Sequence, residues 1–270
     1  MTVILHISDP HFGTERPSVV QALQQLAKDQ RPAVTILSGD ITQRARNVEF
    51  DAARALMRHM PSESCLVLPG NHDIPLFALL TRLFSPYSRY QRVFGNDLEP
   101  TLETPDLLAI GVRTTRRYRH IEGEVSAKQI RRVAQRLKQA RSSQLRIVVT
   151  HQPVFVTRPE DEEHLLRGCE QAIESWAEAG ADLILGGHIH RPFVRALHES
   201  VPGLSRPLWI VQAGTAVSTR IRHDANNSIN LIRYGLPGEV RRCVVERWDY
   251  HEESQAFQLV EEHQLQLSNG

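Results

Sequence analysis

Cysteine is scarce in this sequence of 270 residues, and the charges are almost balanced. The three cysteines, Cys65, Cys169 and Cys243, are scattered and form no Cys-x-x-Cys pair, which argues against a disulfide scaffold or a cysteine-rich zinc site. A formal net charge of +1 gives no overall argument for nucleic acid or a membrane as partner. No run approaches the roughly 20 apolar residues of a membrane span, and no secretory signal is visible. We therefore expect a cytoplasmic protein without a membrane partner.

The remaining composition is that of an ordinary globular protein. Hydrophobic residues make up 41% of the chain and charged residues 23%, which is enough to bury a large core. The length fits one or two domains, and single α/β domains of this size are common.

Apolar strands alternate with amphipathic helices through the first 190 residues. This alternation predicts βαβ units, with parallel strands and right-handed crossovers. Ser126 and Gln129 form a plausible capping box at the start of one helix. The expected strands are 3–7, 34–38, 65–68, 107–112, 145–150 and 181–185, and the expected helices are 18–28, 49–60, 126–141 and 162–179.

Two regions depart from this alternation. Residues 74–104 contain an expected helix at 76–84 and then Pro86, Gly95 and Pro100, and we interpret them as an insertion near the site. Past residue 190 the helices stop, which predicts an antiparallel sheet added to the α/β body. The strands expected there are 193–197, 208–212, 229–234, 240–248 and 257–261.

Polar side chains follow the apolar strands directly. Because ligands bind at the carboxyl ends of strands in such sheets, we expect these side chains to converge on one rim. Carboxylate and imidazole together suit divalent zinc, manganese or iron, and not a dedicated calcium site. The metal-ligand candidates are Asp9, His11, Asp40, Asn71, His151, His188 and His190.

Seven candidates exceed the four ligands of a closed tetrahedral zinc site. They fit two metal ions that share a bridging carboxylate, an arrangement that activates water and clamps both oxygens of a phosphoryl displacement. Four further histidines lack this position after a strand, and we expect them to be structural. They are His6, His59, His164 and His198.

Five short blocks in this order resemble the calcineurin-like metallophosphoesterases. The blocks are Asp9-x-His11, Gly39-Asp40, Gly70-Asn71-His72-Asp73, His151 and Gly187-His188-Ile189-His190, and the match runs from residue 3 to about residue 215. The resemblance implies a single domain over 1–270, a four-layer α/β/β/α sandwich. In it, a mixed sheet from the βαβ body (1–190) packs on a second, more antiparallel sheet completed by residues 191–265.

The resemblance also implies a role for each residue. One metal ion would be held by Asp9, His11, Asp40 and His190, and the other by Asp40, Asn71, His151 and His188, with Asp40 bridging. His72 would face the phosphoryl group and leaving oxygen as a general acid or transition-state stabiliser. Asp73 either orients His72 or only caps a helix.

The runs Asp40-Ile41-Thr42-Gln43-Arg44 and Ala213-Gly214-Thr215-Ala216 look most like the bacterial class III cyclic nucleotide phosphodiesterases. This resemblance implies a phosphoric diester hydrolase acting on small substrates of the 3′,5′-cyclic nucleotide type. The nucleophile would be a hydroxide activated by two divalent metal ions (Mn, Fe or Zn), without a covalent intermediate. The alternatives are a phosphomonoesterase or a nucleotide-type pyrophosphohydrolase with the same centre, and, behind these, a nuclease or a metal-binding scaffold without catalysis.

Arginines in loops after expected strands are candidates for binding substrate phosphate. We single out Arg44, Arg113 and Arg220. The basic loop 113–120 also contains Tyr118, a mixture that occurs in single-stranded nucleic-acid sites, but one such loop in a chain of net charge +1 does not predict nucleic-acid binding. The oligomeric state is open, and the late strands or the 74–104 insertion offer surfaces for a homodimer.

Overall fold

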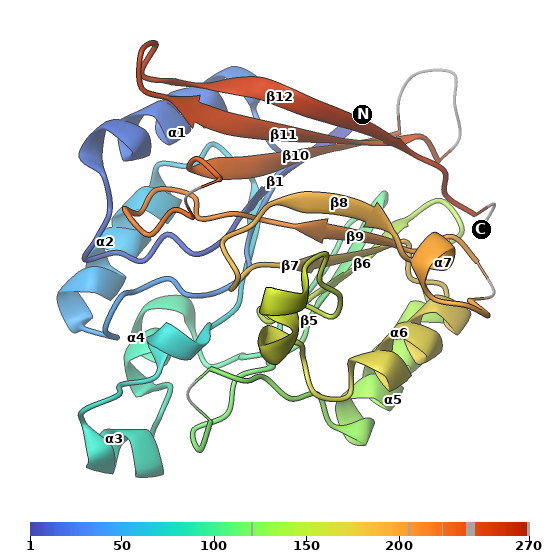
Figure 1. Cartoon of the computed structure of the whole chain (residues 1–270), viewed down its shortest axis with the longest axis horizontal. Coiled ribbons are helices and arrows are strands. Elements are labelled where there is room, and N and C mark those ends of the chain that lie inside the picture. Colours follow the sequence, from blue (N-terminus) through green and yellow to red (C-terminus); the bar gives the residue numbers. More distant parts are fainter. Residues whose placement is uncertain (120, 205, 223, 236–240, 269–270) are drawn as a thin grey trace.

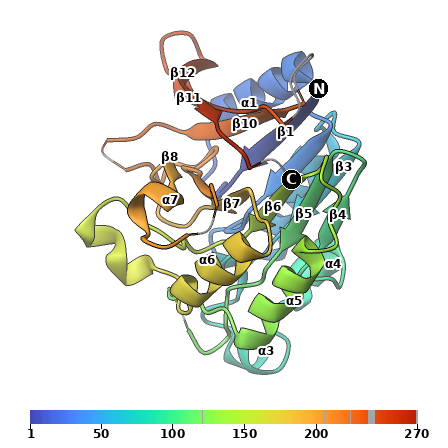
Figure 2. The same cartoon turned by 90° about the vertical axis from the view of Figure 1, so that its right-hand side faces the viewer.

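The computed structural model shows two sheets packed together, with helices outside them (Figure 1). It describes residues 1–119, 121–204, 206–222, 224–235 and 241–268. The turned view separates the helices beside the first sheet from those beside the second (Figure 2). This arrangement confirms the expected four-layer α/β/β/α sandwich. Within the described ranges, no helix combines the length and apolar character needed to cross a bilayer.

The first sheet joins the two ends of the chain. Its strands lie in the order β12-β11-β10-β1-β2-β3. Strands β1, β2 and β3 are parallel, whereas β10, β11 and β12 pair antiparallel. In chain order the six strands span Thr2–Ile7, Val34–Leu37, Ser64–Val67, Ser228–Tyr234, Cys243–His251 and Ala256–Leu265.

The second sheet comes from the middle of the chain, in the order β4-β5-β6-β7-β9-β8. Its four inner strands are parallel, and the edge strands β4 and β8 pair antiparallel with their neighbours. From β4 to β9 the strands span Thr101–Glu103, Leu107–Gly111, Leu145–Val149, Leu183–Gly186, Phe193–Ala196 and Trp209–Gln212.

The expectation that the C-terminal strands complete one sheet is wrong. Strands β8 and β9 join the second sheet, whereas β10, β11 and β12 extend the N-terminal sheet through the pairing of β1 with β10. The burial of β10 explains this placement, because six of its seven residues are buried, as in an inner strand covered on both faces. Pairing with β10 also protects the edge that β1 would otherwise expose.

Three apolar clusters fill the spaces between the layers. Helices α1 (Pro17–Gln30) and α2 (Asn47–Arg58) pack on the outer face of the first sheet. Helices α5 (Ala127–Leu137) and α6 (Cys169–Glu178) cover the second sheet. The third cluster lies between the sheets and joins residues such as Ile36 and Leu185. The core therefore holds both sheets in a fixed relation.

Local signals explain the helix boundaries. Helix α1 begins with Pro17 at its first position, where the missing N–H costs nothing. The Ser126 side chain accepts from the Gln129 N–H at the start of α5, so the capping box is present. The helix expected over 162–179 is interrupted, because Gly168 has a left-handed φ of 84° and α6 begins only after it. Before this break, residues Pro159–His164 form a separate 3-10 turn, η2.

The 74–104 region contains more structure than expected. Helix α3 is shorter than predicted (Leu79–Phe84), a further helix α4 spans Ser88–Phe94, and strand β4 adds an edge to the second sheet. A 3-10 turn, η1 (Asn71–Asp73), precedes this region, and a short helix α7 (Leu197–Ser200) follows β8. The expected start of a late strand at Val240 lies outside the described residues.

Candidate metal centre

The loops after five strands bring all seven ligand candidates to one edge of the sandwich. These loops follow β1, β2 and β3 in the first sheet and β6 and β7 in the second. Close backbone approach makes this convergence possible. A Cβ at Gly70 would overlap Asp40, and one at Gly187 would overlap Ser8 and Asp9. The glycines in these motifs are therefore required by packing between neighbouring loops.

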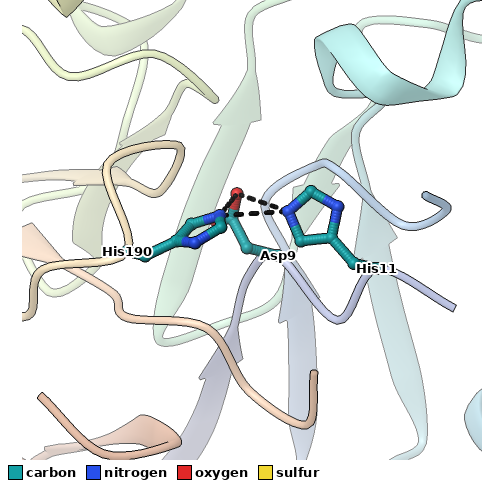
Figure 3. A group of neighbouring side chains, drawn as sticks. All are labelled: Asp9, His11 and His190. Carbon is teal, nitrogen blue, oxygen red and sulfur yellow. Dashed lines mark hydrogen bonds and ion pairs between the residues drawn. The ribbon is translucent and has the colours of Figure 1, made fainter. Parts of the chain in front are cut away.

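The first group of ligands comprises Asp9, His11 and His190, whose side chains point toward one another (Figure 3). The Nε2 atoms of His11 and His190 are 3.0 Å apart. The Asp9 Oδ1 atom lies 3.3 Å from His190 Nε2 and 3.8 Å from His11 Nε2. All three residues are buried, so their polar atoms face one another at a point shielded from bulk water.

The second group comprises Asp40, His151 and His188. The His151 Nε2 atom lies 3.2 Å from Asp40 Oδ1 and 3.1 Å from the amide oxygen of Asn71. The other Asp40 oxygen, Oδ2, lies 3.7 Å from His11 Nε2 in the first group. Asp40 therefore presents one oxygen to each group, which is the position of a bridging carboxylate.

Backbone carbonyls orient two of the imidazoles. The Nδ1 of His151 is 2.9 Å from the Ser38 carbonyl oxygen, and the Nδ1 of His190 is 2.6 Å from that of Arg220. A carbonyl only accepts, so each Nδ1 carries the proton and each Nε2 offers its lone pair to the cluster. Hydrogen bonds of this kind fix the tautomer of metal-binding histidines.

Two buried ligand atoms have no hydrogen-bond partner among the described residues: Asp9 Oδ1 and His188 Nδ1. The other oxygen of Asp9 accepts from the Ser8 hydroxyl at 2.6 Å and from the His188 N–H at 2.8 Å. A buried polar atom without a partner costs about 1–3 kcal/mol. A divalent cation in each group would satisfy these atoms, and the mixed oxygen and nitrogen donors suit manganese, iron or zinc. The residues present therefore fit two metal ions.

The backbone is strained at the same positions. Nine non-glycine residues in the described ranges have a positive φ between 42° and 73°. Five of them are ligand candidates, namely Asp9, His11, Asp40, His188 and His190. Left-handed backbone costs about 1–2 kcal/mol for an ordinary residue. Such strain gathers at functional sites because the surrounding fold holds it there.

The electrostatics of the cluster favour a positive charge between its carboxylates. Burial raises the pKa of Asp40, but the nearby His151 and His72 outweigh it and hold the pKa of Asp40 well below its usual range. Burial lowers the pKa of His151, but the Asp40 carboxylate outweighs it and raises the pKa of His151 to about 9. The pocket therefore stabilises a cation next to Asp40, which is also what a divalent ion requires.

His72 lies at the rim of the cluster in η1. One of its ring nitrogens and one ligand atom each of His11 and Asp40 all lie within 4.8 Å of one another, which is close enough for the three residues to contact a common ion. Its Nδ1 is 3.0 Å from the Gln43 carbonyl oxygen, and its Nε2 is 3.1 Å from Nη1 of Arg220. The ring is half-buried and lines a pocket of about 490 Å³ together with Asp40 and His188. His72 is thus placed between the ligands and the pocket.

Asp73 serves as a clamp between two loops. Its carboxylate accepts hydrogen bonds from the Gly70 N–H at 2.8 Å, from the Ile41 N–H at 3.1 Å, and from the N–H and hydroxyl of Thr42 at 2.9 and 2.8 Å. Burial, with the charge of Asp40 adding to it, raises the pKa of Asp73 to about 7 against these four hydrogen bonds. Asp73 caps η1 and fixes the Asp40 loop relative to His72.

The three arginine candidates occupy different places. Arg220 lines the pocket and touches His72. Arg44 is exposed, and its guanidinium lies 5.8 Å from the centre of the Phe77 ring. Arg113 stacks on Tyr87 at 5.3 Å and lines a separate pocket. Of the three, the structure therefore brings Arg220 to the ligands.

Two residues of the pocket wall, His164 and Arg222, were not predicted as site residues from the sequence. His164 lines the pocket, and its Nδ1 lies 3.2 Å from Nε2 of His188. When His188 donates its Nε2–H to His164, its unpartnered Nδ1 keeps a lone pair for the cluster. No local pattern marks His164 as a site residue, because η2 brings it to the pocket from a region that the sequence predicts as helix.

Comparisons with known proteins agree with this geometry. Residues 2–192 match the model of a family described as calcineurin-like phosphoesterase, and the matched part contains all seven ligand candidates. No curated protein sequence gives a significant match.

Several solved structures have a similar fold. Purple acid phosphatase PPD1 from yellow lupin (Lupinus luteus) seeds has a TM-score of 0.74 at 11% identity, covering 97% of this chain and 53% of that one. This chain thus spans about half the length of the lupin protein. A dimetal phosphatase from Danio rerio has a TM-score of 0.66 at 13% identity, covering 99% of both chains. A single mutant of Vps29 from Entamoeba histolytica has a TM-score of 0.51 at 10% identity, covering 98% of this chain and 100% of that one. At these identities the likeness establishes the fold.

Proposed function

Since the chain belongs to the calcineurin-like phosphoesterase family, we propose that it hydrolyses small phosphodiesters of the 3′,5′-cyclic nucleotide type. The pairing of His72 with Arg220 beside the two ligand groups carries this proposal. A site that only stored metal would have no use for an oriented imidazole and a guanidinium on the open side of its ligands.

The described residues would hold two divalent ions. Asp9, His11, Asp40 and His190 would hold one ion, and Asp40, Asn71, His151 and His188 would hold the other. When bound, such a pair supplies an activated water as nucleophile and stabilises negative charge on the phosphoryl oxygens. We propose manganese, iron or zinc, because these metals accept mixed carboxylate and imidazole ligands.

His72 is the proposed proton donor. The Gln43 carbonyl receives the Nδ1–H and leaves Nε2 directed toward the pocket. In the structure Nε2 accepts from Nη1 of Arg220, because a guanidinium only donates. With the substrate phosphate bound to Arg220 instead, a protonated Nε2 would transfer its proton to the leaving oxygen as the phosphorus–oxygen bond breaks. General acid catalysis of this kind contributes about 10²–10⁴-fold to the rate.

The charges in the pocket wall support a diester. Arg222 also lines the pocket, but its guanidinium is 3.2 Å from the buried carboxylate of Asp161. Within the described part of the chain, Arg220 contacts Gln43, His11 and His72 and no carboxylate. One guanidinium without a carboxylate partner matches the single negative charge of a diester better than the two charges of a monoester. A monoesterase or pyrophosphohydrolase is the second candidate, because the ligand groups suit all three reactions.

The experiment is a substrate panel on the metal-loaded protein, with bis-p-nitrophenyl phosphate, cyclic AMP, p-nitrophenyl phosphate and a nucleotide-sugar diphosphate. We expect turnover of both diesters, and a fall of about 10²–10⁴-fold in kcat for His72→Ala with unchanged metal content. The exposed His59 supplies the matched control, His59→Ala, which should behave as the unmodified protein. Turnover of monoesters alone would favour the second candidate, and full activity of His72→Ala would refute its assigned role.

A separate experiment on the same substrates tests direct attack of water on phosphorus. Single-turnover hydrolysis in ¹⁸O-water should place the label on phosphorus, because water attacks phosphorus and not the ester carbon. Trapping of a phosphorylated side chain would contradict this mechanism.

A further inference from the structure

Helix α3 and the turn before it expose a group of large apolar side chains. Phe77, Leu79, Leu80, Leu83 and Phe84, which we call the α3 patch, are each between 51% and 79% exposed. Leu80, Leu83 and Phe84 share one helix face by their spacing, and no residue of α3 is buried. The helix projects from one corner of the molecule, at the lower left in Figure 1 and at the bottom in Figure 2. Exposed apolar groups of this size mark interaction surfaces.

The chain around the patch is basic. Residues 74–95 and 113–119 contain no aspartate or glutamate, although the whole chain is nearly neutral. Their arginines are Arg82, Arg89, Arg92, Arg113, Arg116, Arg117 and Arg119. Three of these, Arg92, Arg116 and Arg119, form ion pairs with carboxylates outside the two segments, so the charge available at the α3 patch depends on Arg82, Arg117 and Arg44.

Three arginines border the α3 patch directly. Arg117 donates to the Leu83 carbonyl oxygen at 2.5 Å, and Arg82 joins α3 to the 113–119 loop through the Arg119 carbonyl oxygen at 2.9 Å. Arg44 lies over the Phe77 ring. Within the described residues, the bonds of Arg82 and Arg117 go to carbonyl oxygens and not to carboxylates, so their charges are available to an anionic partner.

We propose that the α3 patch docks on an anionic lipid surface. Apolar side chains would enter the boundary between headgroups and acyl chains, while the bordering arginines would contact lipid phosphates. A symmetric contact with a second copy would bring Arg82 and Arg117, whose bonds go to carbonyl oxygens, close to the same arginines of that copy, which is unfavourable. This proposal replaces the expectation of no membrane partner. The net charge of the whole chain does not reveal a local excess of positive charge.

Docking would also bring the candidate metal centre near the lipid. Phe77 follows His72 by five residues, and a chain of that length spans at most about 18 Å. The attachment is peripheral, since no helix in the described ranges can cross a bilayer.

The test is cosedimentation of the metal-loaded full chain with vesicles of phosphatidylcholine alone or with one quarter phosphatidylglycerol. Each arginine at an anionic surface strengthens binding by about fivefold. Three arginines therefore predict a preference of about 100-fold for the anionic vesicles, lost at high salt. The double variant Leu80→Glu/Phe84→Glu should bind at least about tenfold more weakly, and Arg82→Gln/Arg117→Gln about 25-fold more weakly.

Two controls separate docking from other causes. Leu259→Glu/Val260→Glu alters two exposed apolar side chains on β12 and should bind vesicles normally. Hydrolysis of bis-p-nitrophenyl phosphate by the Leu80→Glu/Phe84→Glu variant should match the unmodified protein, which shows that the fold is intact. Equal binding to both vesicle types, or normal vesicle binding by Leu80→Glu/Phe84→Glu, would overturn the proposal. A dimer in light scattering that the same variant abolishes would instead assign the patch to a second copy.

Discussion

The two ends of the sandwich each bury carboxylates, with different partners. At the end where the parallel strands begin, which we call the amino end, Asp182 precedes β7. Each of its two carboxylate oxygens lies 2.7 Å from Nη2 of Arg241. Arg206 donates to Oδ1 at 3.1 Å, and the Arg146 N–H donates to Oδ2 at 2.9 Å. At the carboxyl end, Asp9 Oδ1 is buried without a hydrogen bond among the described residues.

The chemistry of the neighbours explains the difference. Guanidinium groups carry no lone pair for a metal and stay charged, so they close the Asp182 site permanently. Imidazoles around Asp9 and Asp40 offer lone pairs instead, and a cation satisfies both kinds of ligand together. We therefore assign the Asp182 carboxylate to the stability of the fold and propose that the Asp9 and Asp40 carboxylates bind ions. The predictions below test this division.

The largest expected effect follows removal of the bridging carboxylate. Asp40→Ala takes one ligand from each group, so we expect diesterase activity to fall by about 10³-fold or more and both metals to be lost. Metal analysis and the diester assay on one sample measure this. Asp51→Ala, which removes a half-exposed carboxylate on α2, is the control. Two bound metals in Asp40→Ala would contradict the bridging role.

The opposite result is expected at the amino end. Asp182→Asn leaves the Arg241 guanidinium buried without its carboxylate, which should lower the free energy of unfolding by about 3–5 kcal/mol. Activity per folded molecule should stay unchanged. Urea denaturation of the metal-loaded protein measures the first quantity and the diester assay the second. A loss below about 1 kcal/mol would mean that the Asp182 cluster contributes little to stability.

Removal of the metal ions should lower the free energy of unfolding through the carboxyl end alone. Each ion that binds the folded chain stabilises it by about 2.7 kcal/mol when its free concentration is 100 times Kd, so chelation of both ions should remove about 5.4 kcal/mol. Because Asp182 precedes β7 and His188 follows it, the two sites lie at opposite ends of that strand, and the same loss should occur in Asp182→Asn within about 0.5 kcal/mol. Thermal and urea unfolding with and without chelator measure it. A loss that differs strongly between the two proteins would show that the ends are coupled.

The sequence predicted the ligand cluster because its signals are local. Each ligand candidate directly follows an apolar strand, and parallel strands bring their carboxyl ends together. The four-layer fold and the calcineurin-like family were implied by the resemblance of five motif blocks, and both are confirmed. The assignment of late strands to sheets was wrong, because it depends on pairing between β1 and β10, which lie more than 200 residues apart.

Loop positions were the least predictable part of the site. Arg44, Arg113 and Arg220 have the same local context in the sequence, yet Arg220 reaches the pocket while Arg44 and Arg113 stack on aromatic rings outside it. His164 was assigned a structural role and lies beside His188, 24 residues away in the chain. These outcomes depend on how long loops pack, and no pattern of neighbouring residues encodes that packing.

The smallest predicted effect concerns His164, which acts on the metal centre through His188. His164→Ala removes the partner of His188 Nε2, and loss of such an outer partner weakens metal binding by about 10–100-fold. We expect a value near the lower limit, since His164 is only half-buried and water can replace it. Metal titration should show one weakened site and one normal site, because His190 keeps its own carbonyl partner. His164→Asn, which retains an acceptor near Nδ1, should restore affinity, and His198→Ala should have no effect. Equal weakening of both sites would mean that His164 supports the pocket as a whole rather than orienting His188.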